Sequence, residues 1–437
     1  MNILALNCGS SSLKYQVYHW EERDILAKGV VERIGLEGAF INHDKKGKDK
    51  VKIYNNCQTH KDALELVLRT LTSEENGIMD NINDIHAVGH RMIHGGTAFT
   101  KSVQIDGKEG SVLNKMRENY NLAPLHNPPS VLGAEAALDL LPSVPHVAVL
   151  DTAFHQTMPA TSFLYPLPYE WYEEMDVRRY GFHGTSHLYV SRRAAALLGK
   201  KPHEVNLITC HIGNGVSFTA IKNGLSYDTS MGFTPLEGLV MGTRSGDFDP
   251  AIILYIMEKK GYSFQEMSDI LNKKSGILGL TQKWVDQRDL CEAMDHGDER
   301  AKLTFDLQAY RAKKYLGAYA FALGKVDAIV FTAGVGEMSP ELREPILEGL
   351  EPFGIYYDKE ANWKTKSRNR ESIISKPDSP IKVFVIPTDE EIVFIEDVVA
   401  IIDGSYDTHD KFEYTFQRPD YVNKIRQEAL QKELKKK

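Results

Sequence analysis

The sequence contains one pattern of strands and turns at two distant places. Residues 1–19 read as an apolar strand, the turn GSSS and an alternating strand. Residues 206–230 read as an apolar strand, the turn GNG and two more strands separated by Asn-Gly. The two copies are about 205 residues apart. This repetition predicts a duplicated architecture in which one turn from each half faces a shared cleft.

Length and composition narrow the class of protein. A chain of 437 residues is expected to form two domains of roughly 200 residues each. Its apolar share of 42% and charged share of 26% are typical of a soluble globular protein. The net charge of −8 argues against a nucleic-acid partner. No apolar run approaches the roughly 18–20 residues that span a bilayer, so no membrane partner is expected.

The cysteines and the N-terminus favour a cytoplasmic location. The four cysteines show no C-x-x-C spacing, which predicts reduced thiols rather than a disulfide framework or a zinc site. The N-terminus lacks the basic region and sustained apolar region of a signal peptide.

Strands alternate with helices between and after the two copies, which predicts an α/β fold with mixed sheets. Strands are expected at 86–96 and 144–154, and helices at 127–142 and 184–200. Two strand–loop–helix units follow at 327–350 and 382–404, and 364–372 is expected to be a solvated loop. No Pro/Gly/Ser linker is present, so the domain junctions are expected to be tight, near 150 and near 387.

Three helix starts carry capping signals. Thr185 or Ser186 is the N-cap candidate of one helix, and Ser339 precedes Pro340 in another. In "PTDEE", Thr388 and Glu391 have the spacing of a capping box. That assignment would leave Glu390 to face a metal.

The last residues form a separate tail. After Gly404 the chain is polar and irregular, and then four apolar residues recur at helical spacing: Val422, Ile425, Ala429 and Leu434. This pattern predicts a docked or half-solvated terminal helix, and a docking surface for an acidic partner is the alternative.

Several polar residues stand where chemistry is possible. Arg91 and Ile93 would share one face of a strand, which suits a ligand with a carboxylate and a short apolar tail, although an ordinary ion pair at a strand end is the simpler reading. Asp151 follows an apolar strand, where a carboxylate can hold Mg²⁺ or act as a base. His183 and His187 could be two zinc ligands, or His183 could face an anion from the loop ahead of a helix.

Three segments have features of phosphate sites. The turn after Asn7 carries three serines and Lys14, and the alternative is a polar turn with a surface lysine. The Gly/Pro-rich segment 231–250 cannot be a continuous helix, and it carries Arg244, which would suit a transferring phosphoryl group. "AGVGE" ends a strand with small residues that let a nucleotide approach, but it is not a complete nucleotide-binding fingerprint.

Taken in order, these motifs resemble those of the acetate kinases. The matching stretches are "NCGSSSLKYQ", "GHRMIHGG", "LAPLHNPP", "DTAFHQTMP", "RRYGFHGTSH", "HIGNGVS", "TSMGFTPLEGLVMGTRSGDFDP", "NKKSGILG", "DQRDL", "AGVGE" and "IPTDEE", from residue 1 to about 403. The resemblance implies the duplicated actin-like (ribonuclease H-like) kinase fold, with two domains, mixed sheets and a central cleft. It implies a first domain of residues 1–150 completed by 388–437, and a second domain, 151–387, that binds the nucleotide and forms the dimer interface.

The same resemblance implies the reaction and its ions. Acetate kinases transfer a phosphoryl group reversibly between ATP and acetate, giving acetyl phosphate and ADP, by direct in-line transfer with Mg²⁺, or Mn²⁺ as an alternative ion. A homodimer is implied. Carried onto matching positions, the catalytic residues are Asn7, Arg91, Asp151, His183 and Arg244, of which His183 and Arg244 stabilise the transition state.

The remaining implied residues surround the ion and the two substrates. Asn7 and Glu390 are the implied metal residues. The residues implied around acetate are Arg91, Ile93, Leu125, Phe182 and Pro235. The residues implied at the nucleotide are Ser12, Lys14, His211, Gly213, Asn214, Gly215, Asp286, Gln287, Arg288, Gly334, Val335, Gly336, Glu337 and Met338.

The sequence departs from the family pattern at three places. "TQKW" and Met338 stand where many members have other residues beside the adenosine, so they leave the nucleotide preference open. The third departure is the extension past Gly404, to which the resemblance assigns no function. Trp284 could stack on a base or pack in the interior. Two other classes stay open at this stage, namely an actin-like chaperone module with slow ATP hydrolysis and a zinc hydrolase built on His183 and His187.

Overall fold

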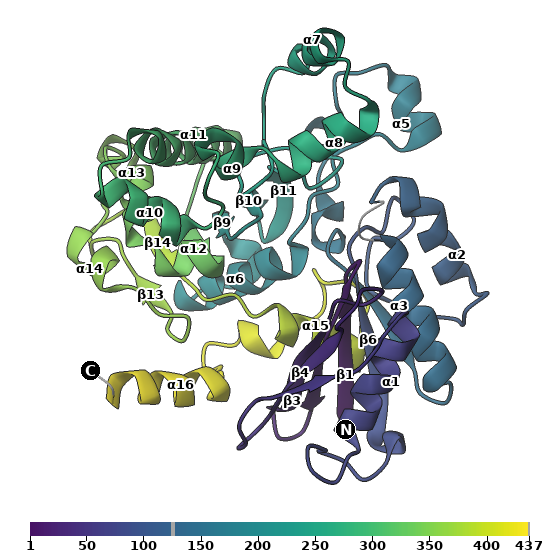
Figure 1. The fold of residues 1–437 in the computed structure, drawn as a ribbon. Coiled ribbons are helices and arrows are strands. Elements are labelled where there is room, and N and C mark those ends of the chain that lie inside the picture. Colours follow the sequence, from purple (N-terminus) through teal and green to yellow (C-terminus); the bar gives the residue numbers. More distant parts are fainter. Residues whose placement is uncertain (124–126, 436–437) are drawn as a thin grey trace. The chain divides into compact units, whose positions relative to one another are not determined.

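The computed structural model describes residues 1–123 and 127–435 and divides the chain into two compact units. The first unit comprises Met1–Phe154 and Asp389–Tyr414. The second comprises His155–Thr388 and the segment from Thr415 onward. The sequence assigned all of 388–437 to the first domain, whereas the part after Tyr414 belongs to the second unit. The colours of Figure 1 follow the sequence, from purple at the N-terminus to yellow at the C-terminus.

The first unit is built on an eight-stranded mixed sheet with the order β5-β4-β3-β2-β1-β6-β8-β7. β1, β6 and β8 are parallel, and β2–β5 continue from β1 as antiparallel neighbours. The strands are β1 (Asn2–Cys8), β2 (Ser12–His19), β3 (Asp24–Glu32), β4 (Phe40–Lys45), β5 (Val51–Tyr54), β6 (Ile85–Met92), β7 (Val103–Gln104) and β8 (His146–Leu150). The helices are α1 (His60–Leu71), α2 (Ser111–Glu118), α3 (Asn127–Leu140) and α15 (Glu390–Ile402).

Helices cover both faces of this sheet. α1 and α3 pack on one face, where Leu4 and Leu6 of β1 join a buried apolar cluster with residues of both helices. α15 packs on β6 from the other face, so closely that a Cβ on Gly89 would lie 2.3 Å from the ring of Phe394. Because β6 is covered on both sides, its buried residues fix the strand firmly at the point where it reaches Arg91.

The second unit repeats the first topology. Its six-stranded sheet has the order β11-β10-β9-β12-β14-β13, so β9, β12 and β14 are parallel and β10 and β11 extend from β9 as antiparallel neighbours. The strands are β9 (Leu207–Ile212), β10 (Val216–Lys222), β11 (Leu225–Thr229), β12 (Ala328–Thr332), β13 (Ser372–Ile373) and β14 (Lys382–Val385). The duplication predicted from the two strand–turn–strand patterns is therefore present.

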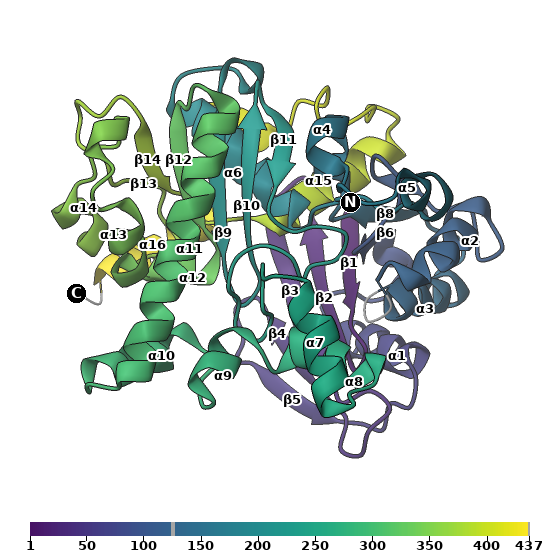
Figure 2. The same ribbon diagram turned by 90° about the horizontal axis from the view of Figure 1, so that it is seen from above.

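The helices of the second unit include one long element, α11, which packs on β9 and β10, and α6, which packs on β9 and β12 (Figure 2). The helices are α4 (Ala160–Phe163), α5 (Tyr169–Met175), α6 (Gly184–Leu197), α7 (Ala251–Lys260), α8 (Phe264–Lys273), α9 (Gly276–Thr281), α10 (Gln287–Asp295), α11 (Glu299–Leu323), α12 (Ala333–Met338), α13 (Pro340–Leu347), α14 (Lys359–Lys364) and α16 (Lys424–Lys435). Among the described residues, no helix has the length and hydrophobicity that crossing a membrane requires.

Two local predictions need correction. β6 ends at Met92, so Ile93 lies just past the strand, and strand alternation does not set its direction relative to Arg91. The N-cap of α6 is His183 rather than Thr185 or Ser186. His183 has a positive φ of 57°, and its side chain makes no capping hydrogen bond. A non-glycine residue in this conformation is uncommon and is held there by its surroundings.

Candidate functional site

In the first unit, Arg91 is held by two carboxylates. Its Nε and Nη2 donate to the two oxygens of Asp151 at 3.0 and 2.8 Å, and Nη2 also lies 3.2 Å from Oε2 of Glu390. Burial alone would lower the pKa of Arg91, but the two carboxylates outweigh it and raise that pKa. Within the described residues, Nη1 of Arg91 makes no hydrogen bond, which leaves two N–H groups for a ligand.

The strand register brings the polar residues of this unit to one edge of the sheet. Leu6 pairs with His90, so Asn7 lies level with Arg91 at the end of β1. Asp151 directly follows β8, and Leu150 is level with Met92. Parallel strands thus deliver an amide, a guanidinium and a carboxylate to their carboxyl ends, where α/β sheets bind ligands.

The other predicted residues of the first unit are placed as follows. Ser12 and Lys14 follow the first turn, and the exposed Lys14 lies opposite Asn7 across β1 and β2. Ile93 is half-buried beyond the end of β6. Leu125 lies outside the described residues.

The start of α15 differs from the predicted capping box. Asp389 is the N-cap, and its side chain accepts a hydrogen bond from the backbone N of Ile392 at 3.1 Å. Thr388 does not cap the helix, because its hydroxyl oxygen makes no hydrogen bond to the described residues. Its backbone N donates to Oε1 of Glu337 at 3.0 Å, which occupies the N–H that a capping box would offer to Glu391. Glu391 is exposed. The capping role of Thr388 and Glu391 is therefore wrong, while Glu390, at the first helical position, faces Arg91.

In the second unit, the turn between β9 and β10 lies against a histidine and an arginine. A Cβ on Gly215 would lie 3.3 Å from Nε2 of His183 and 3.5 Å from Nη1 of Arg244. Gly242 donates its N–H to the carbonyl of Asn214 and leaves no room for a side chain, because a Cβ would lie 2.0 Å from Oδ1 of Asn214. The resemblance implied four of these residues from distant motifs, and the structure brings them together: His183, Asn214, Gly215 and Arg244.

Arg244 is a half-buried cation that has no acidic partner among the described residues. Its Nη1 donates to the carbonyl of Pro235 at 3.2 Å and lies 3.9 Å from Sδ of Met241. In the part of the chain that the structure describes, no carboxylate lies within 4.0 Å of its guanidinium. Burial accordingly lowers the pKa of Arg244. A desolvated positive charge of this kind attracts an anion.

Ser217, which the motifs did not single out, orders the histidines around this turn. Its hydroxyl contacts Nδ1 of His183 at 2.8 Å and Nε2 of His187 at 2.7 Å. The other ring nitrogen of His187 contacts the hydroxyl of Thr209, so both nitrogens are used and His187 is a poor zinc ligand. The ring of His211 stacks on that of His183 with centroids 4.0 Å apart. The only sequence feature that could have indicated Ser217 is the apolar–polar alternation of β10, and this feature is weak evidence for a site residue.

The "AGVGE" segment forms the short helix α12 directly after β12. Ala333, the first residue of this segment, has a positive φ of 66°. A Cβ on Gly334 would lie 3.3 Å from Nη2 of Arg368, another residue outside the motifs. Glu337 is 4% exposed, whereas Met338 is 38% exposed.

The "DQR" segment gives a mixed result for the predicted nucleotide residues. Asp286 caps α10, and its hydrogen bonds from Arg288 lower the pKa of Asp286 to about 2. The Arg288 side chain is otherwise exposed. Gln287 is buried, with its Nε2 directed to Sγ of Cys291, so its side chain is not presented to a ligand.

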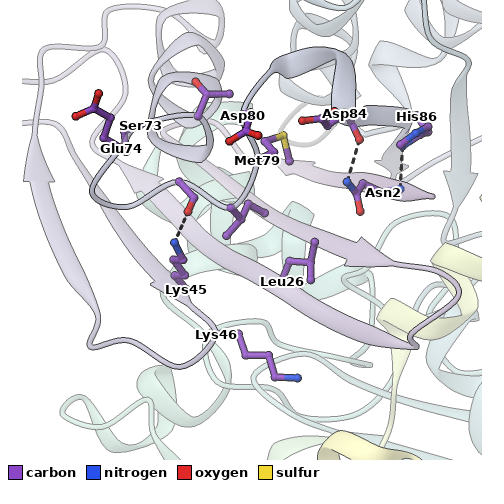
Figure 3. Close-up of a pocket in the computed structure, with 13 residues that line it drawn as sticks. Asn2, Leu26, Lys45, Lys46, Ser73, Glu74, Met79, Asp80, Asp84 and His86 are labelled. Atoms are coloured by element: carbon purple, nitrogen blue, oxygen red, sulfur yellow. Dashed lines mark hydrogen bonds between the residues drawn. The ribbon is translucent and has the colours of Figure 1, made fainter.

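A pocket of about 770 Å³ lies at the other end of the same strands of the first unit (Figure 3). Asn2 and His86 line it, at the starts of β1 and β6, about five residues or roughly 16 Å along the strands from Asn7 and Arg91. Two hydrogen bonds join its lining: the backbone N–H of Asn2 donates to Nδ1 of His86, and Nδ2 of Asn2 donates to the carbonyl of Asp84. This pocket is separate from the edge where Arg91 lies.

Comparison with known proteins identifies the family. The model of the acetokinase family matches residues 2–396. The acetate kinase of Geobacter metallireducens is 58% identical over 422 residues, which cover 97% of this chain and 100% of that protein. The chain belongs to the acetokinase family. Within it, the acetate kinase of Treponema pallidum is 51% identical over 100% of this chain and 97% of that protein, so the alignment includes the C-terminal tail.

Two solved structures match the fold. The acetate kinase of Porphyromonas gingivalis superposes with a TM-score of 0.87 at 45% identity, covering 92% of this chain and 99% of that chain. A propionate kinase from Francisella tularensis gives a TM-score of 0.84 at 38% identity, covering 92% and 99%. Both proteins are acyl kinases by name, so this chain has the architecture of that group of enzymes.

Proposed function

We propose that this chain is an acetate kinase, which transfers the γ-phosphoryl group of ATP directly to acetate and gives acetyl phosphate and ADP in a reversible reaction. Membership of the acetokinase family supports this activity. The observation that carries the site assignment is Arg244, which lies beside Gly215 and His183 and forms no ion pair with the residues that the structure describes. Phosphoryl transfer depends mainly on positioning and on charge stabilisation, and a cation such as Arg244 supplies the charge stabilisation.

Arg91 would hold the carboxylate of acetate. Its Nη1 is turned away from the bidentate contact with Asp151, and the guanidinium is fixed in plane by that contact. A planar fork whose other edge is already anchored can bind a second carboxylate without first being ordered. Asp151 would therefore act by orienting Arg91.

Arg244 and His183 would stabilise the phosphoryl group in flight. Arg244 lacks an acidic partner among the described residues, so the charge that develops on the phosphoryl oxygens would be its strongest partner. His183 is held by Ser217 through Nδ1, which orients the other edge of its ring toward Gly215. No residue needs to form a covalent bond with the phosphoryl group.

Mg²⁺ fits the donors present in the first unit. Asn7, Asp151 and Glu390 offer amide and carboxylate oxygens, the ligands that this ion prefers, and Mg²⁺ often keeps waters and phosphate oxygens for the rest of its shell. Asn7 and Glu390 would hold the ion, with Mn²⁺ as an alternative. When bound, the ion neutralises charge on the ATP phosphates.

Acetate is proposed over longer acids because of Ile93. The family resemblance assigns Ile93, together with Leu125, Phe182 and Pro235, to the apolar residues around acetate. One methylene is worth only about 1–3 kcal/mol in such a pocket, so propionate should be a poorer substrate rather than an excluded one. Ile93→Ala should bring the kcat/KM of propionate closer to that of acetate, and an unchanged ratio would contradict the pocket.

A homodimer is also proposed, with α7 and α8 at its interface. α7 has no buried residue although its sequence is mostly apolar, and Leu254 and Tyr255 are 73% and 58% exposed. Phe264, at the start of α8, is 86% exposed. Large neighbouring apolar side chains of this kind mark protein interfaces. Light scattering should give twice the mass of the chain, and Leu254→Glu should shift it to the monomer.

The direct test is to trap acetyl phosphate as its hydroxamate. The purified chain with Mg²⁺ would be supplied with ATP, GTP or pyrophosphate, each in combination with acetate, propionate or butyrate. Strong activity with ATP and acetate is expected. Activity with pyrophosphate alone would contradict the proposed nucleotide, and no acyl phosphate with any combination would contradict the proposed function.

A further inference from the structure

The segment that follows Tyr414 packs firmly on the second unit. The ring of Phe416 lies on that of Tyr189, with centroids 4.9 Å apart, and both residues are buried. Arg193 donates to the carbonyls of Phe416 and Arg418 at 2.8 and 3.1 Å, and its other N–H groups bind the carboxylate of Glu371. The chain is thus anchored before α16 begins, although this segment lies beyond the residues matched by the family model.

From this anchor, α16 brings Arg426 to the connection between β14 and α15. Nη1 of Arg426 donates to the carbonyl of Pro387 at 2.6 Å, and Nη2 donates to the carbonyl of Thr388. The guanidinium also lies 5.8 Å from the ring centroid of Tyr189. One planar group therefore holds two successive backbone carbonyls immediately before Asp389.

The Pro387–Thr388 peptide links Arg426 to Glu337. Its carbonyl accepts from Arg426, and its N–H donates to Oε1 of Glu337, at the end of the "AGVGE" segment, at 3.0 Å. Burial raises the pKa of Glu337, while the Thr388 N–H and the charge of Arg426 oppose that rise. The terminal helix and the α12 turn are thus joined through a single peptide group.

A second contact of α16 flanks Arg368. Oε2 of Glu433 accepts from the hydroxyl of Ser367 at 3.0 Å, and its Oε1 accepts from Nδ2 of Asn369. Arg368 stands between these two residues, exposed, with Nη2 close to Gly334. Across residues 1–123 and 127–435, no hydrogen bond or ion pair engages its guanidinium. The helix therefore holds Ser367 and Asn369, the neighbours of Arg368, while the guanidinium of Arg368 makes no hydrogen bond or ion pair with the described residues.

We propose that the C-terminal segment positions the nucleotide site, with Arg426 as a positioning residue for the α12 turn and Arg368 as a direct contact of a bound nucleoside diphosphate or triphosphate. This inference rests on the proposed function, because the proposed function includes the assignment of the α12 turn to the nucleotide. The inference accounts for a polar helix whose apolar residues are largely exposed: Leu434 in α16 is 57% exposed, and Val422, just before the helix, is 56% exposed. The helix contacts the unit through Arg426 and Glu433 instead.

The test compares Arg426→Gln, Arg368→Ala and the control Lys432→Ala in the full chain. Lys432 is exposed on the same helix. Calorimetric titration with Mg·ADP, without acetate, should give about tenfold weaker binding for each of the first two variants and no change for the control. In the kinetic assay, KM for ATP should rise while KM for acetate stays within about twofold. Arg426→Lys should recover part of the loss, because an ammonium can still reach one carbonyl.

The outcomes separate this inference from the proposed function. Unchanged ADP binding in Arg368→Ala or in Arg426→Gln would overturn it, as would a lower Tm of Arg426→Gln with ADP affinity intact. Arg368 is exposed, so that variant is expected to fold even if Arg426→Gln does not. If the wild-type chain binds ADP but makes no acetyl phosphate, the proposed function fails, while the titrations still decide the role of the C-terminal segment.

Discussion

The two units share a sheet topology, but the arginines of their candidate sites have different partners. In the first unit, Arg91 is matched by the carboxylates of Asp151 and Glu390. In the second, Arg244 contacts only a carbonyl and a thioether among the described residues. The duplication thus supplies two similar scaffolds that carry different charges. Under the proposed function, the paired Arg91 would bind the carboxylate of acetate and Arg244 would bind the phosphoryl group.

The largest expected effect is that of replacing Arg244, in the second unit. Arg244→Gln should reduce kcat for acetyl phosphate formation by about 10³-fold, because it removes the cation that meets charge developing on the phosphoryl group. Its Tm should be unchanged or higher, because a partly buried charge that has no acidic partner among the described residues costs stability. Steady-state kinetics and thermal unfolding of the same preparation check both. A large fall in Tm would mean that Arg244 is structural.

Arg91→Gln should behave differently, because it leaves the buried carboxylate of Asp151 without its positively charged partner. Removing one partner of such a pair costs on the order of 3 kcal/mol in the free energy of unfolding, and activity should also fall. The double variant Arg91→Gln/Asp151→Asn should recover stability in urea unfolding but not activity. If the single variant unfolds like the wild type, the Arg91–Asp151 contact is not a stabilising pair.

The pH dependence of stability should also differ between the units. Burial lowers the pKa of His155, in the second unit, to about 4, so its contribution to stability is complete above pH 6.5 and is lost as the pH falls toward 4. Burial raises the pKa of Asp397, in the first unit, to about 7, so its contribution is complete below pH 4 and is lost as the pH rises toward 7.

Two conservative variants separate these contributions. His155→Gln should flatten the acid limb of the unfolding free energy between pH 6.5 and 4. Asp397→Asn should raise stability at pH 7 by about 1 kcal/mol or more relative to pH 4, because a neutral side chain can still contact Ser102 and Tyr414. Parallel pH profiles for both variants and the wild type would contradict these assignments.

The smallest expected effect concerns the start of α15. Asp389→Ala should cost about 1 kcal/mol, because it removes the side chain that caps the helix. Glu391→Ala, at an exposed position two residues later, should change the free energy of unfolding by less than about 0.5 kcal/mol. Urea unfolding of the two variants compares them directly, and equal costs would return a capping role to Glu391.

The architecture could be predicted from the sequence because the relevant signals are local. The strand–turn–strand patterns, the helix that begins at Pro340 after the Ser339 cap and the helix at the C-terminus are all present. The duplication follows from those patterns, and the order of the motifs along the chain is enough to indicate the family.

The errors arose where distant residues decide a local choice. "PTDEE" has the spacing of a capping box, but Glu337 takes the N–H of Thr388 and the cap moves to Asp389. The apolar spacing of the terminal helix predicted its existence but not its contacts, which pass through Arg426 and Glu433. The spacing of apolar residues predicts a helix, but it does not indicate which distant residues that helix contacts.

The most direct test measures ADP and acetyl phosphate in the same sample of wild-type chain with Mg·ATP, with and without acetate. The account predicts that the two products form in equal amounts and that ADP release without acetate is negligible. ADP release that does not depend on acetate would contradict it and would favour a slow ATPase built on the same fold.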